Sequence, residues 1–278
     1  MESRSRTLGG RLFLLVWLSG LTAYSADVAE ERALGALWAV HEQSLAGTAR
    51  AAVLTACRQF EAERPASVFL PVSRGLAVWH LLKAGQSNEA VTRLNAMVVT
   101  NDAAPIAGAG NTMALRWLTR LDRERVKAAL LGYYRVRVQY PEALDGLAAV
   151  PGLPPCPLTD RWGKPWSYRL TRFERIRGLT AQRYELESPT LKAASDFAGR
   201  LAQPYAGAVA LQPTSVTQGG GGRLAVMFRT VATPAQEVLL TEGTDYHGTA
   251  LVYAGQSLLL LSDGDTWRVQ PSPAAAKE

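Results

Sequence analysis

The chain has 278 residues, of which 47% are hydrophobic and 19% charged, with a formal net charge of +6. This length allows one to three domains. The apolar fraction is enough to fill a core, which excludes a chain without a folded core, while the charged fraction is low for a soluble protein.

Residues 1–25 have the pattern of an export signal. A basic leader precedes a short apolar run from Leu12 to Leu21, and Ala23 and Ser25 supply the small residues of a cleavage site after Ser25. Ala26 is the second candidate for the cleavage position, and the alternative is an uncleaved N-terminal anchor. The sequence therefore predicts a periplasmic or cell-envelope protein. The leader arginines are Arg4, Arg6 and Arg11.

The two cysteines, Cys57 and Cys156, have two interpretations. An exported protein can keep a disulfide, and a bridge between them would tie the N-terminal helices to a proline-rich loop. In the other interpretation, Cys57 is a small core residue on a helix. No cysteine or histidine pair has ligand spacing, so we expect no metal and no cofactor.

Residues 26–100 predict a helical domain. Helices are expected around Trp38, over 48–63, from Pro71 and over 88–99. The run 77–90 is similar to one tetratricopeptide-type helical hairpin, although no second copy follows at a period of about 34 residues. Side chains recur at helical steps on one face of the first helix, at Leu34, Leu37, Trp38, His41 and Leu45.

Residues 112–202 predict a second domain that begins with helices and continues into strands. The small residues 101–112 are expected to form a loop before helices at 113–121 and 122–139. Strands are then expected at 166–170 and 183–186, with a turn at Gly178, followed by a short helix at 191–201.

The most specific pattern of the chain lies inside this domain. Tyr140 and Pro141 end the helix, because proline disfavours helical geometry at the residue before it, and Leu144 and Leu147 are expected to pack back under the helix. In the turn that follows, Trp162 is expected to supply a buried ring and Gly163 to permit a positive φ. The complete pattern comprises Tyr140, Pro141, Leu144, Leu147, Asp160, Trp162, Gly163, Pro165, Trp166 and Tyr168.

This pattern resembles the globular part of the type II secretion pseudopilins, over roughly residues 122–190. The resemblance implies a helix laid across a small antiparallel sheet, and partners among the proteins of a secretion or pilus apparatus. Two features of that family have no counterpart, the N-terminal assembly helix and the calcium site. The stretch 188–197 contains only Asp196 as a carboxylate, whereas calcium takes about six to eight oxygen ligands.

The C-terminal part predicts a flexible linker at 213–222, a small β module at 223–270 and a disordered tail at 271–278. Asp263 and Gly264 mark a hairpin turn in the module. Residues 234–270 more faintly resemble the small periplasmic β modules of secretion and type IV pilus assembly proteins. Strands are expected at 224–231, 238–241, 249–253, 258–261 and 267–269.

Candidate catalytic residues are few. His41 and His80 lie in amphipathic helices and are interpreted as partly buried helix residues, while His247 lies in a turn where Asp245 could orient it. No nucleophile motif or phosphate loop accompanies them. We therefore expect no catalytic residues.

Residues 160–183 are basic, with aromatic residues interleaved. A nucleic-acid partner is not expected for an exported protein. The segment favours a docking face for an acidic protein or for lipid headgroups at a membrane surface, and the alternative is a merely solvated face.

The sequence thus predicts an α+β chain with a helical domain, a pseudopilin-like domain and a β module. The predicted function is that of an exported, non-enzymatic component or accessory of a type II secretion or type IV pilus-like system, acting by protein–protein docking. The alternatives are a periplasmic helical-repeat adaptor and an uncharacterised periplasmic hydrolase.

Overall fold

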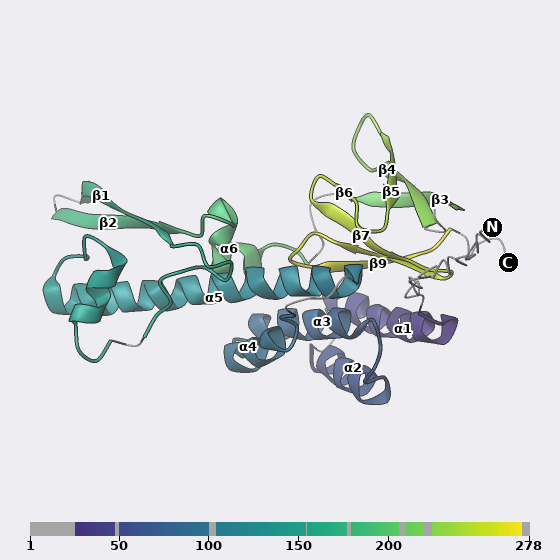
Figure 1. Ribbon diagram of the computed structural model, residues 1–278, viewed down its shortest axis with the longest axis horizontal. Coiled ribbons are helices and arrows are strands. Elements are labelled where there is room, and N and C mark those ends of the chain that lie inside the picture. The colour runs from purple at the N-terminus through teal and green to yellow at the C-terminus, as the bar shows by residue number, and fades with distance from the viewer. Residues whose placement is uncertain are drawn as a thin grey trace, which may run out of the picture.

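A computed structural model describes residues 26–47, 50–99, 104–153, 155–176, 179–205, 210–218 and 224–273. The predicted export signal and the turn at Gly178 lie outside these residues. The described part combines helices with small antiparallel sheets, so the prediction of an α+β fold is confirmed. Its elements are arranged along one long helix, α5 (Pro105–Arg137), as Figure 1 shows.

The helical part consists of α1 (Val28–Leu45), α2 (Arg50–Glu63), α3 (Leu70–Lys83) and α4 (Ser87–Asn95). Each helix packs against the next, and α3 also contacts α5 and the last strand. Since α3 has neighbours on several sides, it is apolar around most of its circumference, and most of its residues from Val72 to Leu82 are buried.

Helix α5 is one continuous helix where the sequence predicted a loop at 101–112 and two separate helices. Pro105 occupies the first turn, where its missing N–H is not needed. Gly110 allows close contact with α3, because a Cβ at this position would lie 2.7 Å from the Cβ of Pro71. Gly110, one of the small residues that favoured a loop, therefore belongs to a helix–helix contact. The helix ends at Val138, which has a left-handed φ of 60°.

The C-terminal half of α5 lies beside a two-stranded antiparallel hairpin, β1 (Ser167–Ile176) and β2 (Leu179–Glu187) (Figure 1). A short 3-10 helix, η1 (Leu144–Ala149), follows α5, and η2 (Lys192–Ser195) and α6 (Phe197–Ala202) follow the hairpin. A separate small core joins α5, η1 and the hairpin, whereas Phe197 and Leu201 of α6 pack against the larger core of the helical part. The small core consists of Val126, Ala129, Leu130, Leu144, Leu147, Trp166 and Leu186.

The β module consists of two sheets. One has the order β3-β4-β5, from β3 (Leu211–Gln218), β4 (Leu224–Thr230) and β5 (Glu237–Thr241). The other has the order β6-β7-β8-β9. Its strands are β6 (Asp245–Tyr246), β7 (Thr249–Ala254), β8 (Leu258–Ser262) and β9 (Trp267–Pro271).

Two expectations for this region differ from the structure. Residues 213–218 of the expected linker form strand β3, which pairs with β4 through Val216 and Val226, while residues 219–222 lie outside the described residues. In the expected tail, Pro271 belongs to β9 and Ser272 is buried, while residues 274–278 lie outside the described residues. The composition of the two segments suggested a linker and a tail, but strand pairing places residues 213–218 in β3 and Pro271 in β9.

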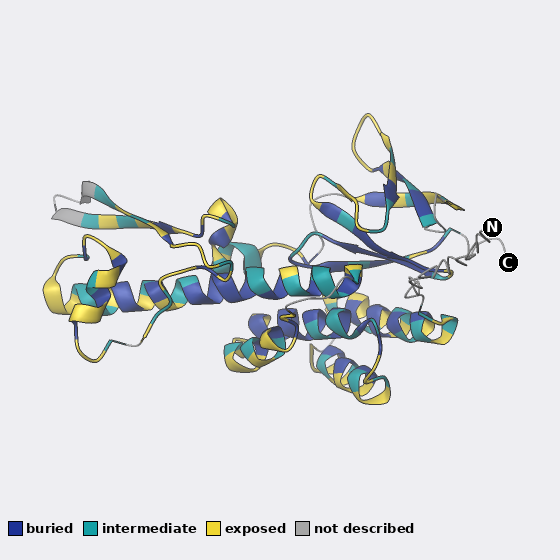
Figure 2. Ribbon diagram, viewed as in Figure 1, coloured by how far each residue is buried: buried dark blue, intermediate teal, exposed yellow. Residues whose placement is uncertain are grey.

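The four-stranded sheet lies between the helices and the three-stranded sheet. Leu258 and Leu260 of β8 belong to the core shared with α1, α3 and α5, and Leu259 and Leu261 pack against β4 and β5. The unbroken leucine run of β8 is explained by burial of both strand faces. Figure 2 shows burial concentrated in this layered body and more exposed residues around the hairpin and η1.

Candidate protein docking site

The residues of the sequence pattern come together in one unit. It is formed by the C-terminal half of α5, from Asp122 onward, together with η1 and the strands β1 and β2, and we call it the helix–hairpin unit. Asp160 organises its central turn. One oxygen of the Asp160 carboxylate accepts the backbone N–H groups of Trp162 and Lys164, both at 3.0 Å. The other accepts the hydroxyls of Ser188 and Thr190 at 2.8 and 2.9 Å.

These contacts also set the charge state of Asp160. Its side chain is buried, which by itself raises the pKa, but the hydrogen bonds from Ser188 and from the backbone of Lys164 outweigh burial and hold the pKa of Asp160 below its ordinary value. Gly163 has a φ of +78°, and a bridge between Thr159 and Pro165 closes the turn. The turn is therefore a rigid, internally bonded structure.

Arg161 fixes this turn to α5. Its guanidinium donates to the buried carboxylate of Asp122, and its backbone N–H donates to the hydroxyl of Thr119 at 3.2 Å. Arg123 of α5 donates to the carbonyl of Leu186 at the end of β2, at 2.8 Å. The hairpin and the helix are thus held together by polar contacts on both sides of the turn.

The buried tryptophan of the pattern is Trp166, where the sequence suggested Trp162. Trp162 is only half-buried, whereas Trp166 lies in the small core and its indole N–H donates to the carbonyl of Pro157 at 2.9 Å. Trp166 immediately precedes the first strand, so its side chain turns inward against α5, while Trp162 lies at the tip of the turn.

A row of tyrosines covers the outer end of the unit. The ring of Tyr140 lies 4.8 Å from Tyr134 and 4.7 Å from Tyr184, between ring centroids, and the Tyr168 hydroxyl donates to the carbonyl of Pro141 at 2.8 Å. Burial raises the pKa of Tyr140, Tyr168 and Tyr184. Half-buried tyrosines of this kind combine an apolar ring with a polar group, a composition that is enriched in protein interfaces.

The same unit exposes apolar side chains. Leu131 and Val136 on α5 are 45% and 63% exposed, Val138 at its end is 76% exposed, and Leu158 before the turn is 47% exposed. Arg135 and Arg137 are exposed beside them. Large exposed apolar side chains with basic neighbours in the sequence fit a protein partner.

The basic segment 160–183 is partly neutralised where its side chains are described. Arg161 binds Asp122, and Arg169 binds Glu185 at 2.6 Å. The side chains of residues 172–181 lie outside the described set. The segment therefore adds less free positive charge to the surface than its sequence suggests.

The two cysteines are free thiols. Cys57 lies in the core of the helical part, where burial raises the pKa of its thiol to about 12, and Cys156 packs against the separate core of the helix–hairpin unit. The structure therefore does not form the possible bridge between them, which was one of the two interpretations. The interpretation of Cys57 as a small core residue agrees with its complete burial.

The three histidines have different environments. His247 is exposed on the turn between β6 and β7 with a φ of 49°. His41 and His80, expected to be partly buried, are buried side by side, with Nδ1 of His41 3.0 Å from Nε2 of His80. Their separation of 39 residues hid this contact from the sequence.

Two buried polar clusters were not predicted from the sequence. Asp265, in the β8–β9 turn, accepts hydrogen bonds from Arg116 and Arg120 of α5 and Arg200 of α6. Glu31 of α1 accepts the Tyr253 hydroxyl at 2.7 Å and the backbone N–H of Ser257 at 2.7 Å. Both clusters fasten the β module to helices, and their partners lie 65 to 226 residues apart, so no local pattern indicates them.

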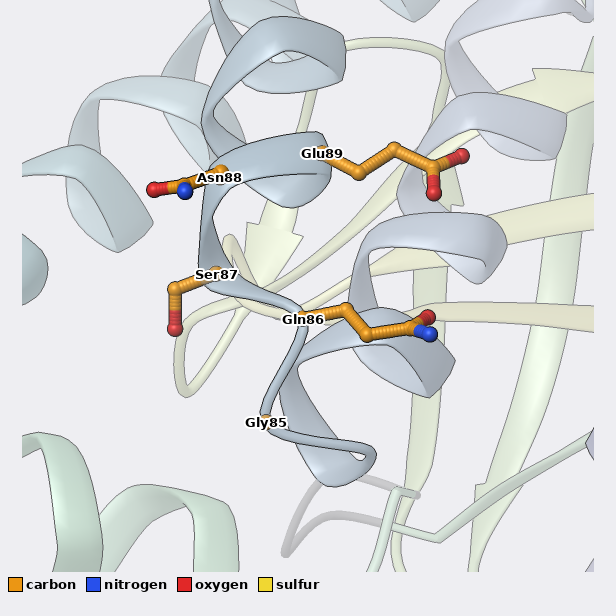
Figure 3. A pocket seen from close by; sticks show the side chains of 5 residues that line it. All are labelled: Gly85, Gln86, Ser87, Asn88 and Glu89. Atoms are coloured by element: carbon orange, nitrogen blue, oxygen red, sulfur yellow. The ribbon is translucent and has the colours of Figure 1, made fainter.

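A hollow of about 360 Å³ lies at the turn between α3 and α4, lined by Gly85, Gln86, Ser87, Asn88 and Glu89. In Figure 3, Ser87 and Asn88 point to one side and Gln86 and Glu89 to the other. One turn of chain supplies all five residues, so no side chains from separate elements converge there in the manner of a ligand site.

Within the described ranges, no cluster of three or more histidine, cysteine, aspartate or glutamate residues could hold a metal ion. None of the helices in those ranges is both long and apolar enough to cross a membrane. Comparison of the chain with protein-family models, with curated proteins and with solved structures gives no match.

Proposed function

We propose that this chain is an exported, non-enzymatic component or accessory of a type II secretion or type IV pilus-like system, and that it acts by docking through the helix–hairpin unit. The observation that carries the proposal is the pseudopilin-like pattern, whose residues make the contacts of that unit. Asp160 and Trp166, both members of the pattern, lie at its turn and in its core. A helix packed beside an antiparallel hairpin is the arrangement that the resemblance implies.

The surface of the unit supports a docking role. Leu131, Val136 and Val138 remain exposed at the end of α5, and the tyrosine row lies on the same unit. Burying apolar side chains stabilises a complex by about 25 cal/mol per Å² removed from water. Because the turn and hairpin are fixed to α5, little conformational entropy would be lost when a partner binds.

Affinity capture of the full-length protein from cell-envelope extract tests the proposal. The wild type should recover identified secretion or pilus proteins, and a Leu131→Asp/Val136→Asp variant should recover at least about tenfold less, since a charge at an apolar contact removes more than about 1.4 kcal/mol of binding free energy. The matched control is Leu45→Asp, at an equally apolar position 54% exposed on α1.

Two outcomes would contradict the proposal: recovery of no apparatus protein by the wild type, or equal recovery by the Leu131→Asp/Val136→Asp variant. Circular dichroism of all three proteins should show the same helix content, so that any loss reports the surface and not the fold.

The alternative of a helical adaptor has its own supporting observation. Helices α1 to α4 pack consecutively, in pairs, as stacked helical hairpins do. In that case the Leu45→Asp variant would lose the partners while the α5 variant keeps them.

The export part of the proposal rests on residues 1–25. Fractionation of cells should place the protein in the cell envelope, and N-terminal sequencing of that fraction should begin at Ala26 or Asp27. A product that retains Met1 in the cytoplasm would contradict export.

A further inference from the structure

The histidine pair between α1 and α3 is buried without a counter-charge. His41 is fully buried and His80 is 5% exposed. One proton lies between Nδ1 of His41 and Nε2 of His80, so one neutral ring donates and the other accepts. The second nitrogen of His41, Nε2, is buried and has no hydrogen-bond partner among the described residues. The described residues around this pocket surround two neutral rings and supply no carboxylate to pair with an added proton.

Tyr205 connects the pair to the β module. Its ring lies 4.4 Å from that of His41 and 5.2 Å from that of Trp79, between centroids. Its hydroxyl accepts the backbone N–H of Trp267, the first residue of β9, at 3.2 Å. One buried side chain therefore contacts both the histidine pocket and the edge of the four-stranded sheet.

The charged groups around the pocket also disfavour protonation. Arg50 of α2 acts on His80 with its positive charge, and Lys83 and Arg200 lie over the Trp79 ring at 5.1 and 5.6 Å. Nearby carboxylates bind other groups. Glu42 of α1 accepts from the indole of Trp38 at 2.9 Å, and Asp263 of the β8–β9 turn pairs with Arg200 at 3.6 Å. The remaining titratable neighbour, the Cys57 thiol, is buried and neutral.

We propose that His41, His80 and Tyr205 form an acid-sensitive lock, in which protonation of the histidine pair opens the contact between helices α1 and α3 and the β module. A cation in this aromatic pocket would lack a carboxylate partner. Opening the contact at Tyr205 would give the imidazolium access to water. The lock does not depend on the docking function proposed above.

The sign of the pH dependence follows from the burial of the pair. Burial, reinforced by the charge of the partner ring, lowers the pKa of His41 from 6.5 to about 3, and burial, reinforced by Arg50, lowers that of His80 from 6.5 to about 4. Above an ordinary histidine pKa both the closed and the opened states are neutral, and the lock has its full stability. As the pH falls below that value, only the opened state gains protons, so the open-to-closed ratio rises up to about tenfold per pH unit for each histidine.

Hydrogen exchange of the full chain at about pH 7.5 and about pH 5, corrected for intrinsic rates, tests the lock in the titration range of histidine. The protection factors of peptides from α1, α3 and β9 should fall at least about tenfold at the lower pH. Peptides from the C-terminal half of α5 and from β2 should keep theirs, since these elements belong to a separate core.

The chain supplies matched variants, because it has only three histidines. The double variant His41→Gln/His80→Gln cannot be protonated in this range, so its protection in α1, α3 and β9 should be the same at both pH values. The His247→Gln variant removes an exposed imidazole from a turn and should respond to acid as the wild type does.

Unchanged protection of the wild type at the lower pH would overturn the lock, as would an equal loss in the double variant. If the double variant does not fold, an NMR titration of the histidine rings in the wild type decides. The lock predicts that the rings of His41 and His80 stay neutral in the closed state. Uptake of protons by these rings above about pH 6 without loss of protection would contradict it.

Discussion

Asp265 is the residue with the largest number of charged contacts in the described structure. Its two carboxylate oxygens accept from Arg116, Arg120 and Arg200, and Arg120 is completely buried. Burial alone would raise the pKa of Asp265, but the hydrogen bonds from Arg116 and the charge of Arg120 outweigh it and hold the pKa well below its ordinary value. This stabilisation is therefore present at neutral pH, and it is lost only as the pH falls through and below the ordinary carboxylate range. That window lies below the pH range in which the histidines of the opened state take up protons.

Replacing Asp265 with Asn should destabilise the fold by about 3–5 kcal/mol, because the completely buried guanidinium of Arg120 would keep its burial and lose its counter-charge. Urea unfolding at neutral pH measures the change. Glu237→Gln, in the exposed pair with Arg229, is the control and should change the unfolding free energy by less than about 1 kcal/mol. A D265N protein as stable as the control would show that the arginines do not depend on this carboxylate.

At the scale of elements, the sequence predicted those helices and turns whose formation is determined by residues close together in the chain. Helix periodicity located α1 to α4, and the Asp-Gly pair located the β8–β9 turn, where Gly264 has a φ of 82°. The continuity of α5 was missed because Gly110 reads as a loop residue until Pro71 lies against it. Strand β3 was missed because its polar residues acquire strand geometry only by pairing with β4.

Two glycine-to-alanine changes should have opposite effects on the free energy of unfolding. Gly163→Ala should destabilise the protein by about 1–2 kcal/mol, since a φ of +78° costs an L-residue about that much. Gly35→Ala should stabilise it by about 0.5–1 kcal/mol, because Gly35 lies inside α1 with no atom within 4 Å of an added Cβ. Thermal unfolding of both variants measures the two changes in stability. Equal effects would show that the turn at Gly163 can relax.

Asp160→Ala should free the turn from both β2 and its own backbone. Hydrogen exchange should increase at least about tenfold over residues 155–168, because a buried network with four donors to one carboxylate would be broken. Asp145→Asn, at an exposed position of η1, should leave the exchange of the same segment unchanged. Protection retained in the Asp160→Ala protein would assign the rigidity of the turn to other contacts.

At the scale of the whole molecule, α5 connects two separate cores. Its N-terminal half packs in the layered body between α3 and the β module, and its C-terminal half forms the helix–hairpin unit (Figure 1). The long-range contacts that fasten the body, at Asp265, Glu31 and the histidine pair, have no signature in the sequence, because each joins residues distant along the chain. The helix–hairpin unit was more accessible to prediction, since its pattern spans a short stretch.

Gly75→Ala should destabilise the layered body and leave the helix–hairpin unit unchanged. An added Cβ would lie 2.4 Å from Nε1 of Trp267 and 2.8 Å from the sulfur of Met113, so α3, α5 and β9 could not all keep their positions. We expect a loss of about 1–3 kcal/mol in urea unfolding. The buried indole of Trp267 should also become accessible to a fluorescence quencher. Unchanged quenching would indicate that the contact between α3, α5 and β9 accommodates an added methyl group without exposing Trp267.

The docking role is tested most directly by photo-crosslinking in cells that contain the protein and a secretion or pilus apparatus. A photoreactive residue at Val136, on the exposed end of α5, should give a crosslink to an identified apparatus protein. The same residue at Leu239, an exposed position of the β module, should give none. Crosslinks to such proteins from Leu239 alone, or none from Val136, would contradict docking through the helix–hairpin unit.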